Sequence, residues 1–165
     1  MTSKIVAPPR PLDRTDRLIL NVLQAHGRIA NVALARRVNL TPTPCLERVR
    51  RLEREGFISG YTAVLNPQMV GAGLLVFVEI SLLRNSRDAF RDFRRQASQL
   101  KGILECHLVS GNFDYLIKAR VRDMQEYQAL LSEQILALPG VSNSRSYVVI
   151  EEIKETTMLP LAELP

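Results

Sequence analysis

The sequence contains no tryptophan and only two cysteines, Cys45 and Cys106, among its 165 residues. Two cysteines are too few for a disulfide framework or a metal cage, and their scarcity favours a reduced compartment such as the cytoplasm. No apolar run reaches about 18 residues, so we expect no membrane-spanning helix. Residues 1–11 lack an apolar core followed by small residues, so we expect no signal peptide.

What is present is an uneven distribution of charge. Hydrophobic residues make up 46% and charged residues 24% of the chain, which excludes wholesale disorder and is typical of soluble globular proteins. The net charge is +5, yet residues 1–60 carry +6 and residues 61–165 carry −1. This asymmetry suggests that the first third meets a polyanion such as nucleic acid. A solvated basic face is the alternative that charge alone leaves open.

The first third begins with a proline-rich segment and two short amphipathic helices. Residues 1–11 contain three prolines and little apolar content, which predicts a flexible basic arm. Asp13, followed three residues later by a second aspartate, is typical of a helix start, and Gly27 is a plausible end. A second helix of about two turns is predicted between Asn31 as its N-cap and Asn39 in the left-handed conformation.

A third helix follows after a very short connection. Thr41 or Thr43 can cap it, because the prolines that follow each threonine fit the first turn, and Gly56 ends it. At about 100° per residue, the inward face centres on Val49. The opposite face then carries Thr43, Glu47, Arg51 and Arg54, flanked by Arg48 and Arg50.

Three helices with a tight second turn and an arginine-rich third helix describe a helix-turn-helix of winged-helix-like type. Arginine can bind phosphate or read guanine edges, and threonine can do either more weakly. We assign phosphate contacts to Arg36, Arg37 and Arg48, and base contacts to Thr43, Glu47 and Arg51. The full predicted DNA-binding set is Asn31, Arg36, Arg37, Thr41, Thr43, Glu47, Arg48, Arg50 and Arg51. A three-helix pack with a solvated arginine face is the alternative.

The rest of the chain predicts a second domain. We expect residues 12–60 to form the DNA-binding domain, 61–73 a linker strand and hinge, 74–155 the second domain and 156–165 a tail. The second domain is predicted to contain four strands, at Leu74–Leu83, Ile103–Val109, Tyr115–Val121 and within Val141–Ile153. It also contains two predicted helices, one capped by Ser86 and one with an Asp123–Glu126 capping box. This β-α-β-β-α-β order is the ferredoxin-like arrangement, so the fold class is α+β.

Such a sheet has helices on one face and leaves the other bare. With strands as apolar as Leu74–Leu83, the bare face should expose a large hydrophobic patch in a monomer. We therefore expect the chain to associate with itself through the sheet.

Several long segments carry a family resemblance over roughly residues 12–155. They are Leu12–Arg14, Thr41–Glu53, Leu75–Ile80, Glu105–Tyr115, Tyr147–Val149 and Glu151–Glu152. These segments resemble the Lrp/AsnC family. The resemblance implies a bacterial, cytoplasmic and nucleoid-associated transcription regulator of amino acid metabolism that forms dimers and often octamers of four dimers.

The resemblance also implies an amino acid effector, leucine or a similar apolar amino acid, bound between neighbouring dimers near the turn that joins the second and third strands. The matching positions are Leu108, Gly111, Asn112, Phe113, Asp114, Tyr115, Met124, Leu136, Tyr147, Val148 and Val149. Asn112 stands where many relatives carry Asp, which lowers the local negative charge.

The chemistry of these residues agrees with an amino acid site. A zwitterion needs an acceptor for its ammonium group, donors for its carboxylate and a pocket for its side chain. Asp114 can accept from the ammonium, and backbone N–H groups around Gly111 and Asn112 can bind the carboxylate. The apolar pocket could be formed by Met124, Leu136 and Val148. The alternatives are a turn role for Asp114 and ordinary core roles for the apolar residues.

No group of residues predicts catalysis or a metal site. Cys106 and His107 should point to opposite faces of a strand, and no further ligand has suitable spacing. Glu151 and Glu152 likewise point apart. We therefore expect no enzyme, no metal and no cofactor other than the effector. Two other functions stay open: an architectural protein that wraps DNA with little effector response, and a small-molecule enzyme on the ferredoxin-like fold.

Overall fold

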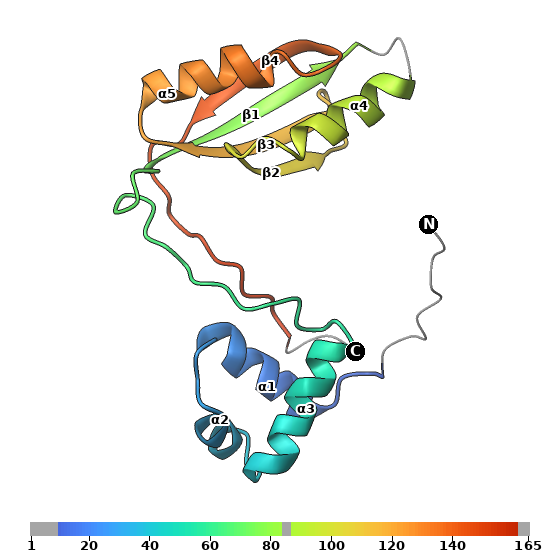
Figure 1. Ribbon diagram of the computed structural model, residues 1–165, viewed down its shortest axis with the longest axis vertical. Coiled ribbons are helices and arrows are strands. Elements are labelled where there is room, and N and C mark those ends of the chain that lie inside the picture. The colour runs from blue at the N-terminus through green and yellow to red at the C-terminus, as the bar shows by residue number, and fades with distance from the viewer. Residues whose placement is uncertain (1–9, 84–86, 162–165) are drawn as a thin grey trace. The chain divides into compact units, whose positions relative to one another are not determined.

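The computed structural model describes residues 10–83 and 87–161, which form two compact units (Figure 1). The helical unit is Met1–Val64 with Glu155–Pro165, and the sheet unit is Leu65–Lys154. No helix in the described part of the chain is long and apolar enough to cross a membrane.

The helical unit contains α1 (Arg14–Ala25), α2 (Asn31–Arg37) and α3 (Pro42–Arg54). Asp13 caps α1 as predicted: its side chain accepts from the Asp16 N–H at 2.8 Å, and the Asp16 carboxylate accepts from the Asp13 N–H at 3.1 Å. This reciprocal pair satisfies two N–H groups that a helix start leaves without partners. The core between the helices consists of Ile19, Leu20, Leu34, Ala35, Val38, Cys45, Val49, Leu52 and Leu161.

The connection from α2 to α3 confirms one prediction and corrects another. Asn39 has a φ of 57°, so it takes the left-handed conformation that ends α2. Asn31 is the first helical residue and not the N-cap, which is Ala30. The Asn31 side-chain amide instead donates to the Pro42 carbonyl oxygen at 2.8 Å and joins the starts of α2 and α3. Thr41, not Thr43, is the N-cap of α3.

The sheet unit has the predicted ferredoxin-like order. Its elements are β1 (Leu74–Leu82), α4 (Arg87–Ala97), β2 (Ile103–Leu108), β3 (Tyr115–Val121), α5 (Met124–Ala129), a π-helix η1 (Leu130–Ile135) and β4 (Val141–Val148). The strand order is β2-β3-β1-β4, and every pairing is antiparallel. The predicted cap at Ser86 lies outside the described residues.

Alternate residues of the central strands form the core beneath the helices. Val76, Val78, Ile80 and Leu82 of β1 are all buried in it, as the period of two in a strand requires. From α4, the buried Phe93 ring lies 4.5 Å from the Tyr115 ring of β3, centroid to centroid. The core also includes Tyr127, Leu130, Ile135 and Leu138, from α5, η1 and the turn after it.

The last helical region differs from the prediction at its start. Met124, for which an ordinary core role was the alternative to a pocket role, is 54% exposed because it is the first residue of α5. The capping box is only half formed. The Asp123 carboxylate accepts from the Glu126 N–H at 2.8 Å, but the Glu126 carboxylate accepts from the Arg122 N–H at 2.6 Å.

Charged side chains interrupt the apolar residues of the open face of the sheet, such as Phe77 and Leu116, so the large hydrophobic patch predicted there is not continuous. Strand alternation sends most of the apolar residues of β1 to the helix side. Lys118 lies 3.1 Å from Glu105 across β3 and β2, and the Tyr147 hydroxyl donates to Glu79 at 2.9 Å across β4 and β1. The charged side chains of this face are Glu79, Glu105, His107, Lys118, Arg120 and Arg145. Self-association therefore needs support other than a hydrophobic patch.

Candidate nucleic-acid interface and ligand site

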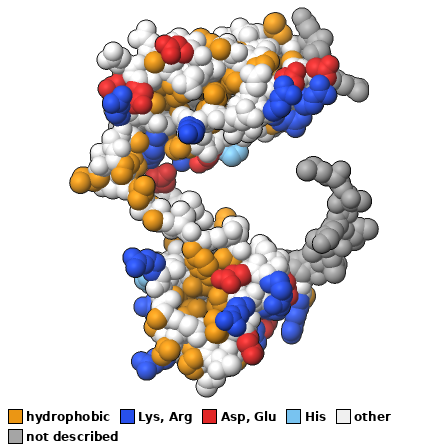
Figure 2. Space-filling model, viewed as in Figure 1, with side chains coloured by type: hydrophobic (Ala, Val, Ile, Leu, Met, Phe, Trp, Pro, Cys, Tyr) orange, Lys and Arg blue, Asp and Glu red, His pale blue; other side chains and the backbone are white. Residues whose placement is uncertain are grey.

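One stripe of α3 is fully available to a partner. Thr43, Glu47, Arg50 and Arg54 are exposed and follow one another at intervals of four, three and four residues, which places them on one face of the helix. Figure 2 shows acidic side chains beside basic ones on the visible side of the helical unit. The stripe can meet phosphate through its two arginines and base edges through Thr43 and Glu47.

Other predicted DNA-binding residues lie in α2 and at the N-terminus of α3. Arg36 and Arg37 are exposed in the last turn of α2, and Thr41 is exposed at the N-cap of α3. Asn31 is half-buried, and its amide is already bonded to Pro42. Arg54 is a member of the exposed stripe that the predicted DNA-binding set left out, although the helical wheel had placed it on the outward face.

Arg48 and Arg51 are held inside the helical unit. The Arg48 Nη1 atom lies 2.6 Å from Asp13 Oδ2 and 2.8 Å from Asp16 Oδ1. Arg51 Nη2 lies 2.5 Å from the second carboxylate oxygen of Asp16, whose side chain is fully buried. Asp16 thus joins the start of α1 to the middle of α3. The helical wheel missed this pairing because it placed Arg51 outward without knowing where α1 lies.

The electrostatics of this cluster favour the ionised forms. Burial raises the pKa of the Asp13 carboxyl, but hydrogen bonds from Arg48 and from the Asp16 backbone outweigh it, so that pKa is lowered overall. Hydrogen bonds to Asp13 and Asp16 raise the pKa of Arg48. Both shifts favour the charged forms of Asp13 and Arg48. The contacts to Asp13 and Asp16 engage two of the arginines, Arg48 and Arg51, that the sequence offered to DNA.

The predicted ligand residues of the loop between β2 and β3 are tied to the end of β1. Asp114 Oδ2 accepts from the Leu82 N–H at 2.8 Å, and the Asp114 N–H donates to the Ile80 carbonyl at 2.9 Å. Gly111 has a φ of 146°, a conformation that favours glycine in this turn. The Asp114 side chain therefore fixes the loop against β1, while the Asp114 carbonyl accepts from the Val109 N–H at 3.0 Å across the same loop.

The remaining predicted ligand residues lie elsewhere on the sheet. Tyr115 pairs with Ile80 near one end of β1, whereas Val148 pairs with Val76 near the other end and on the opposite side of β1. Met124 follows β3, whose last residue pairs with Leu74, so it belongs to the Val148 end. A single chain thus does not bring all the predicted residues into one pocket. Among the large apolar members of the set, the following are more than 40% exposed: Leu108, Met124, Leu136, Tyr147 and Val148.

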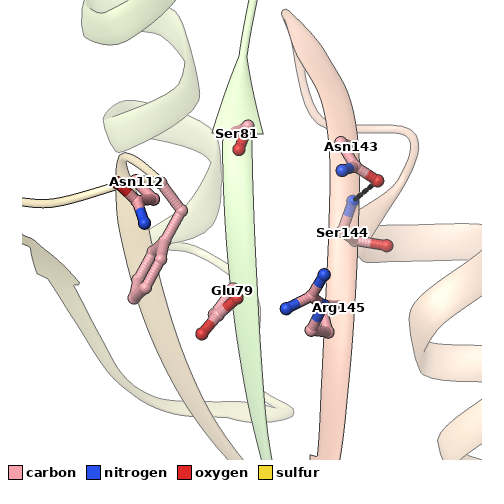
Figure 3. Close-up of a pocket in the computed structure, with 7 residues that line it drawn as sticks. Glu79, Ser81, Asn112, Asn143, Ser144 and Arg145 are labelled. Carbon is pink, nitrogen blue, oxygen red and sulfur yellow. Dashed lines mark hydrogen bonds between the residues drawn. The ribbon is translucent and has the colours of Figure 1, made fainter.

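A polar cavity of about 210 Å³ adjoins the loop (Figure 3). It is lined by Glu79, Ser81, Asn112, Phe113, Asn143, Ser144 and Arg145. Figure 3 shows Glu79 on β1 and Arg145 on β4, and the two residues are partners in the register of these strands. The cavity offers a negative and a positive group, which suits a small polar zwitterion. Sequence reasoning missed both residues, although strand alternation places them opposite the core positions.

The described residues hold no group of three or more His, Cys, Asp or Glu side chains that could bind a metal ion. Cys106 and His107 lie on opposite sides of β2: Cys106 packs against the core, whereas His107 is exposed and its Nε2 lies 3.1 Å from Glu105.

Two family models match this chain. Residues 12–59 match the winged helix-turn-helix DNA-binding model, and residues 75–159 match the Lrp/AsnC ligand binding domain. The chain belongs to the Lrp/AsnC family. It is 60% identical over 152 residues to the leucine-responsive regulatory proteins of Escherichia coli (strain K12) and Salmonella typhimurium, covering 92% of this chain and 93% of each relative.

Solved structures of similar transcriptional regulators have the same fold. A transcriptional regulator of Neisseria meningitidis, solved as its L-Met complex, is 40% identical, has a TM-score of 0.89 and covers 92% of this chain and 98% of its own. An AsnC family transcriptional regulator of Agrobacterium tumefaciens is 34% identical with a TM-score of 0.87, covering 91% and 97%. These relatives confirm the resemblance and the predicted fold class.

Membership in this family settles the class of function. The protein is a DNA-binding, effector-responsive transcription regulator and not an enzyme, so the hypothesis of an enzyme on the ferredoxin-like fold is excluded. The Lrp/AsnC ligand binding domain implies amino acid binding and oligomerisation. Self-association therefore rests on the family, not on the hydrophobic patch that the sequence suggested.

Proposed function

We propose that the protein is a sequence-specific regulator of amino acid metabolism whose assembly and DNA binding respond to leucine or a similar apolar amino acid. The observation that supports this proposal is the set of side chains exposed on the sheet unit. This unit carries exposed apolar residues, among them Leu108, Met124 and Val148, and also the loop that contains Asp114. An apolar amino acid needs both kinds of contact.

The separation of these residues favours a site shared between copies of the chain. Asp114 and Val148 lie near opposite ends of β1, so the loop of one chain and the β4 end of another together would supply the full set. We therefore propose dimers that assemble further, up to an octamer of four dimers. An effector bound between chains shifts assembly because it binds only the assembled form.

The relatives support an amino acid of this class. One solved relative is described as an L-Met complex, and the curated relatives are named leucine-responsive. In our proposal the ammonium group binds the Asp114 carboxylate and the effector carboxylate binds N–H groups at Gly111 and Asn112. Its side chain rests on Leu108, Met124, Leu136 and Val148. Phe113, Tyr115, Tyr147 and Val149 complete the surroundings.

On the DNA side, we propose that Arg36, Arg37, Arg50 and Arg54 bind phosphates, while Thr41, Thr43 and Glu47 face the bases. These side chains are exposed, whereas Arg48 and Arg51 act through Asp16. A DNA-bound regulator would act in the bacterial cytoplasm at the nucleoid.

Thermal unfolding against each of the twenty amino acids tests the effector. A ligand at about 100 times its Kd should add about 2.7 kcal/mol, or several degrees in Tm. We expect a shift with leucine, methionine or similar apolar amino acids, and little shift in the Asp114→Asn variant. Glu79→Gln is the matched control. Loss of the shift in Glu79→Gln alone would place the ligand in the polar cavity.

The absence of any response to amino acids would contradict this proposal. If no amino acid changes either Tm or the affinity for DNA, the protein is an architectural DNA-wrapping protein. A small ratio of specific to non-specific affinity with a steep salt dependence would then accompany that result.

A further inference from the structure

The C-terminal tail belongs to the helical unit, although it follows the last strand of the sheet unit. Glu155–Pro165 groups with Met1–Val64, and the described part of the tail extends to residue 161. Leu161 is only 9% exposed and is part of the hydrophobic core around Ile19 and Leu52. The tail is thus part of the DNA-binding unit and not a loose end.

A specific clamp holds the tail on α1. The Gln24 side-chain amide donates to the Leu159 carbonyl at 3.1 Å, and the Leu159 N–H donates to the Gln24 Oε1 atom at 2.7 Å. Both hydrogen-bonding groups of one side chain therefore bind the backbone of one tail residue, as a neighbouring strand would. The Leu159 side chain is 68% exposed, so the contact depends on the backbone.

The tail lies over an apolar groove. A cavity of about 310 Å³ remains beside the tail. Its lining comes from α1 (Leu20 and Leu23), from the segment after α3 (Phe57 and Tyr61) and from the tail itself (Leu159 and Leu161). Burial, together with a hydrogen bond to Glu53, raises the pKa of Tyr61 to about 12, so its hydroxyl stays neutral in this groove.

The helical unit is consequently attached to the sheet unit by two covalent connections. One joins Val64 to Leu65, and the other joins Lys154 to Glu155. The second connection lies six residues after the end of β4, the strand that carries Tyr147 and Val148. Without the docked tail, the helical unit would be joined to the sheet unit only through the connection between Val64 and Leu65.

We propose that the docked tail is a second tether that fixes how the assembled protein presents its paired DNA-binding units. A single flexible connection lets each unit explore a large volume, which lowers the effective concentration of the second unit at the DNA. Two connections reduce that freedom. Docking of the tail therefore makes binding to two adjacent DNA sites tight and dependent on their spacing.

Two variants release the tail in different ways. Gln24→Ala removes the clamp and leaves the core intact, and a chain that ends after Lys154 removes the tail altogether. The matched control is Met158→Ala, because Met158 lies in the tail but is 48% exposed. Circular dichroism of the full-length variants first establishes that the helices remain folded. If the shortened chain does not fold, Gln24→Ala alone decides the question.

The readout is the affinity for duplexes with one copy of a sequence selected by the unmodified protein, with two copies in phase, and with two copies half a helical turn out of phase. We expect the unmodified protein and Met158→Ala to prefer the in-phase duplex by about tenfold or more. Release of the tail should reduce this preference to within about threefold while single-copy affinity changes little.

Two results would overturn the proposal. One is a phase preference that survives in both variants, and the other is an equal loss on all duplexes, which would mean that the tail only stabilises the fold. The experiment rests on the proposed sequence-specific DNA binding, which the selection itself tests separately. If no sequence is selected, the proposed function fails and the tail is then tested by amide exchange in α1.

Discussion

One charged cluster of the helical unit and one charged pair of the sheet unit differ in how far their carboxylates are buried. In the helical unit the carboxylate of Asp16 is fully buried and pairs with Arg48 and Arg51 between α1 and α3. In the sheet unit the Glu105–Lys118 pair lies on the open face, where the Glu105 side chain is 46% exposed. Water cannot reach a buried charge to replace a lost partner, whereas it can solvate an exposed one, so the cluster at Asp16 should contribute more to stability than the pair at Glu105.

The comparison also bears on the arginine-rich sequence of α3. The predicted DNA-binding set included Arg48, Arg50 and Arg51 of α3, yet Arg48 and Arg51 are committed to Asp16. Those left on the exposed stripe are Arg50 and Arg54. Net charge therefore overstates the number of DNA contacts wherever acidic residues are buried in the same unit.

Replacing the buried aspartate should have the largest effect. Asp16→Ala leaves two arginines partly buried without their partner, and breaking such a pair costs about 3 kcal/mol or more of unfolding free energy. Urea unfolding followed by circular dichroism measures it. Asp88→Ala is the control, since its exposed pair with Arg91 should contribute less than about 0.5 kcal/mol. Equal values for the two variants would contradict the contrast between buried and exposed pairs.

Two arginines one residue apart should behave differently. Arg51→Ala removes a charged contact to Asp16 and should lower the unfolding free energy by about 2 kcal/mol. Arg50→Ala should change stability by less than about 0.5 kcal/mol but weaken DNA binding and reduce the salt slope by about one. Unfolding and salt-dependent DNA titrations on both variants check this. A stable Arg51→Ala protein that loses only specific binding would restore Arg51 as a base reader.

The smallest effect is expected on the open face of the sheet. Hydrogen bonds from His107 and Lys118 lower the pKa of Glu105 below its ordinary value of 4.5. The folded state therefore favours the ionised carboxylate, and this contribution is complete above pH 4.5 and is lost as the pH falls through the lowered pKa.

Glu105→Gln consequently should cost less than about 0.5 kcal/mol at pH 7, because solvent screens the half-exposed pair. The difference from the unmodified protein should shrink as the pH falls below 4.5. Chemical denaturation at pH 7 and at a series of pH values below 4.5 measures it. A difference that grows toward low pH would show that the sign of this contribution is reversed.

Local signals were sufficient to predict much of the fold. Asp13 begins α1 because its side chain satisfies helix N–H groups, and Asn39 ends α2 because it tolerates a positive φ. The strand Tyr115–Val121 was predicted at its observed bounds because alternation and flanking turn residues agree. Each of these features depends on neighbours only a few residues away.

The predictions were wrong where a side chain's partner lies on another helix or in another part of the chain. The Asn31 side chain bonds Pro42 across the turn, and Arg51 turns toward Asp16 from another helix. A helical wheel has no information about either partner. The predicted ligand residues stay a hypothesis for the same reason, since Asp114 and Val148 lie apart in one chain and their relation depends on a second copy.

The two thiols have a consequence for following the units separately. Cys45 is fully buried in the helical unit and Cys106 is partly covered in the sheet unit, and burial raises the pKa of both. A thiol reacts as its thiolate and only when reagent reaches it. Alkylation of Cys45 therefore reports each transient opening of the DNA-binding unit, and alkylation of Cys106 reports opening of its neighbour. Each unit therefore contains one cysteine whose alkylation rate measures how often that unit opens.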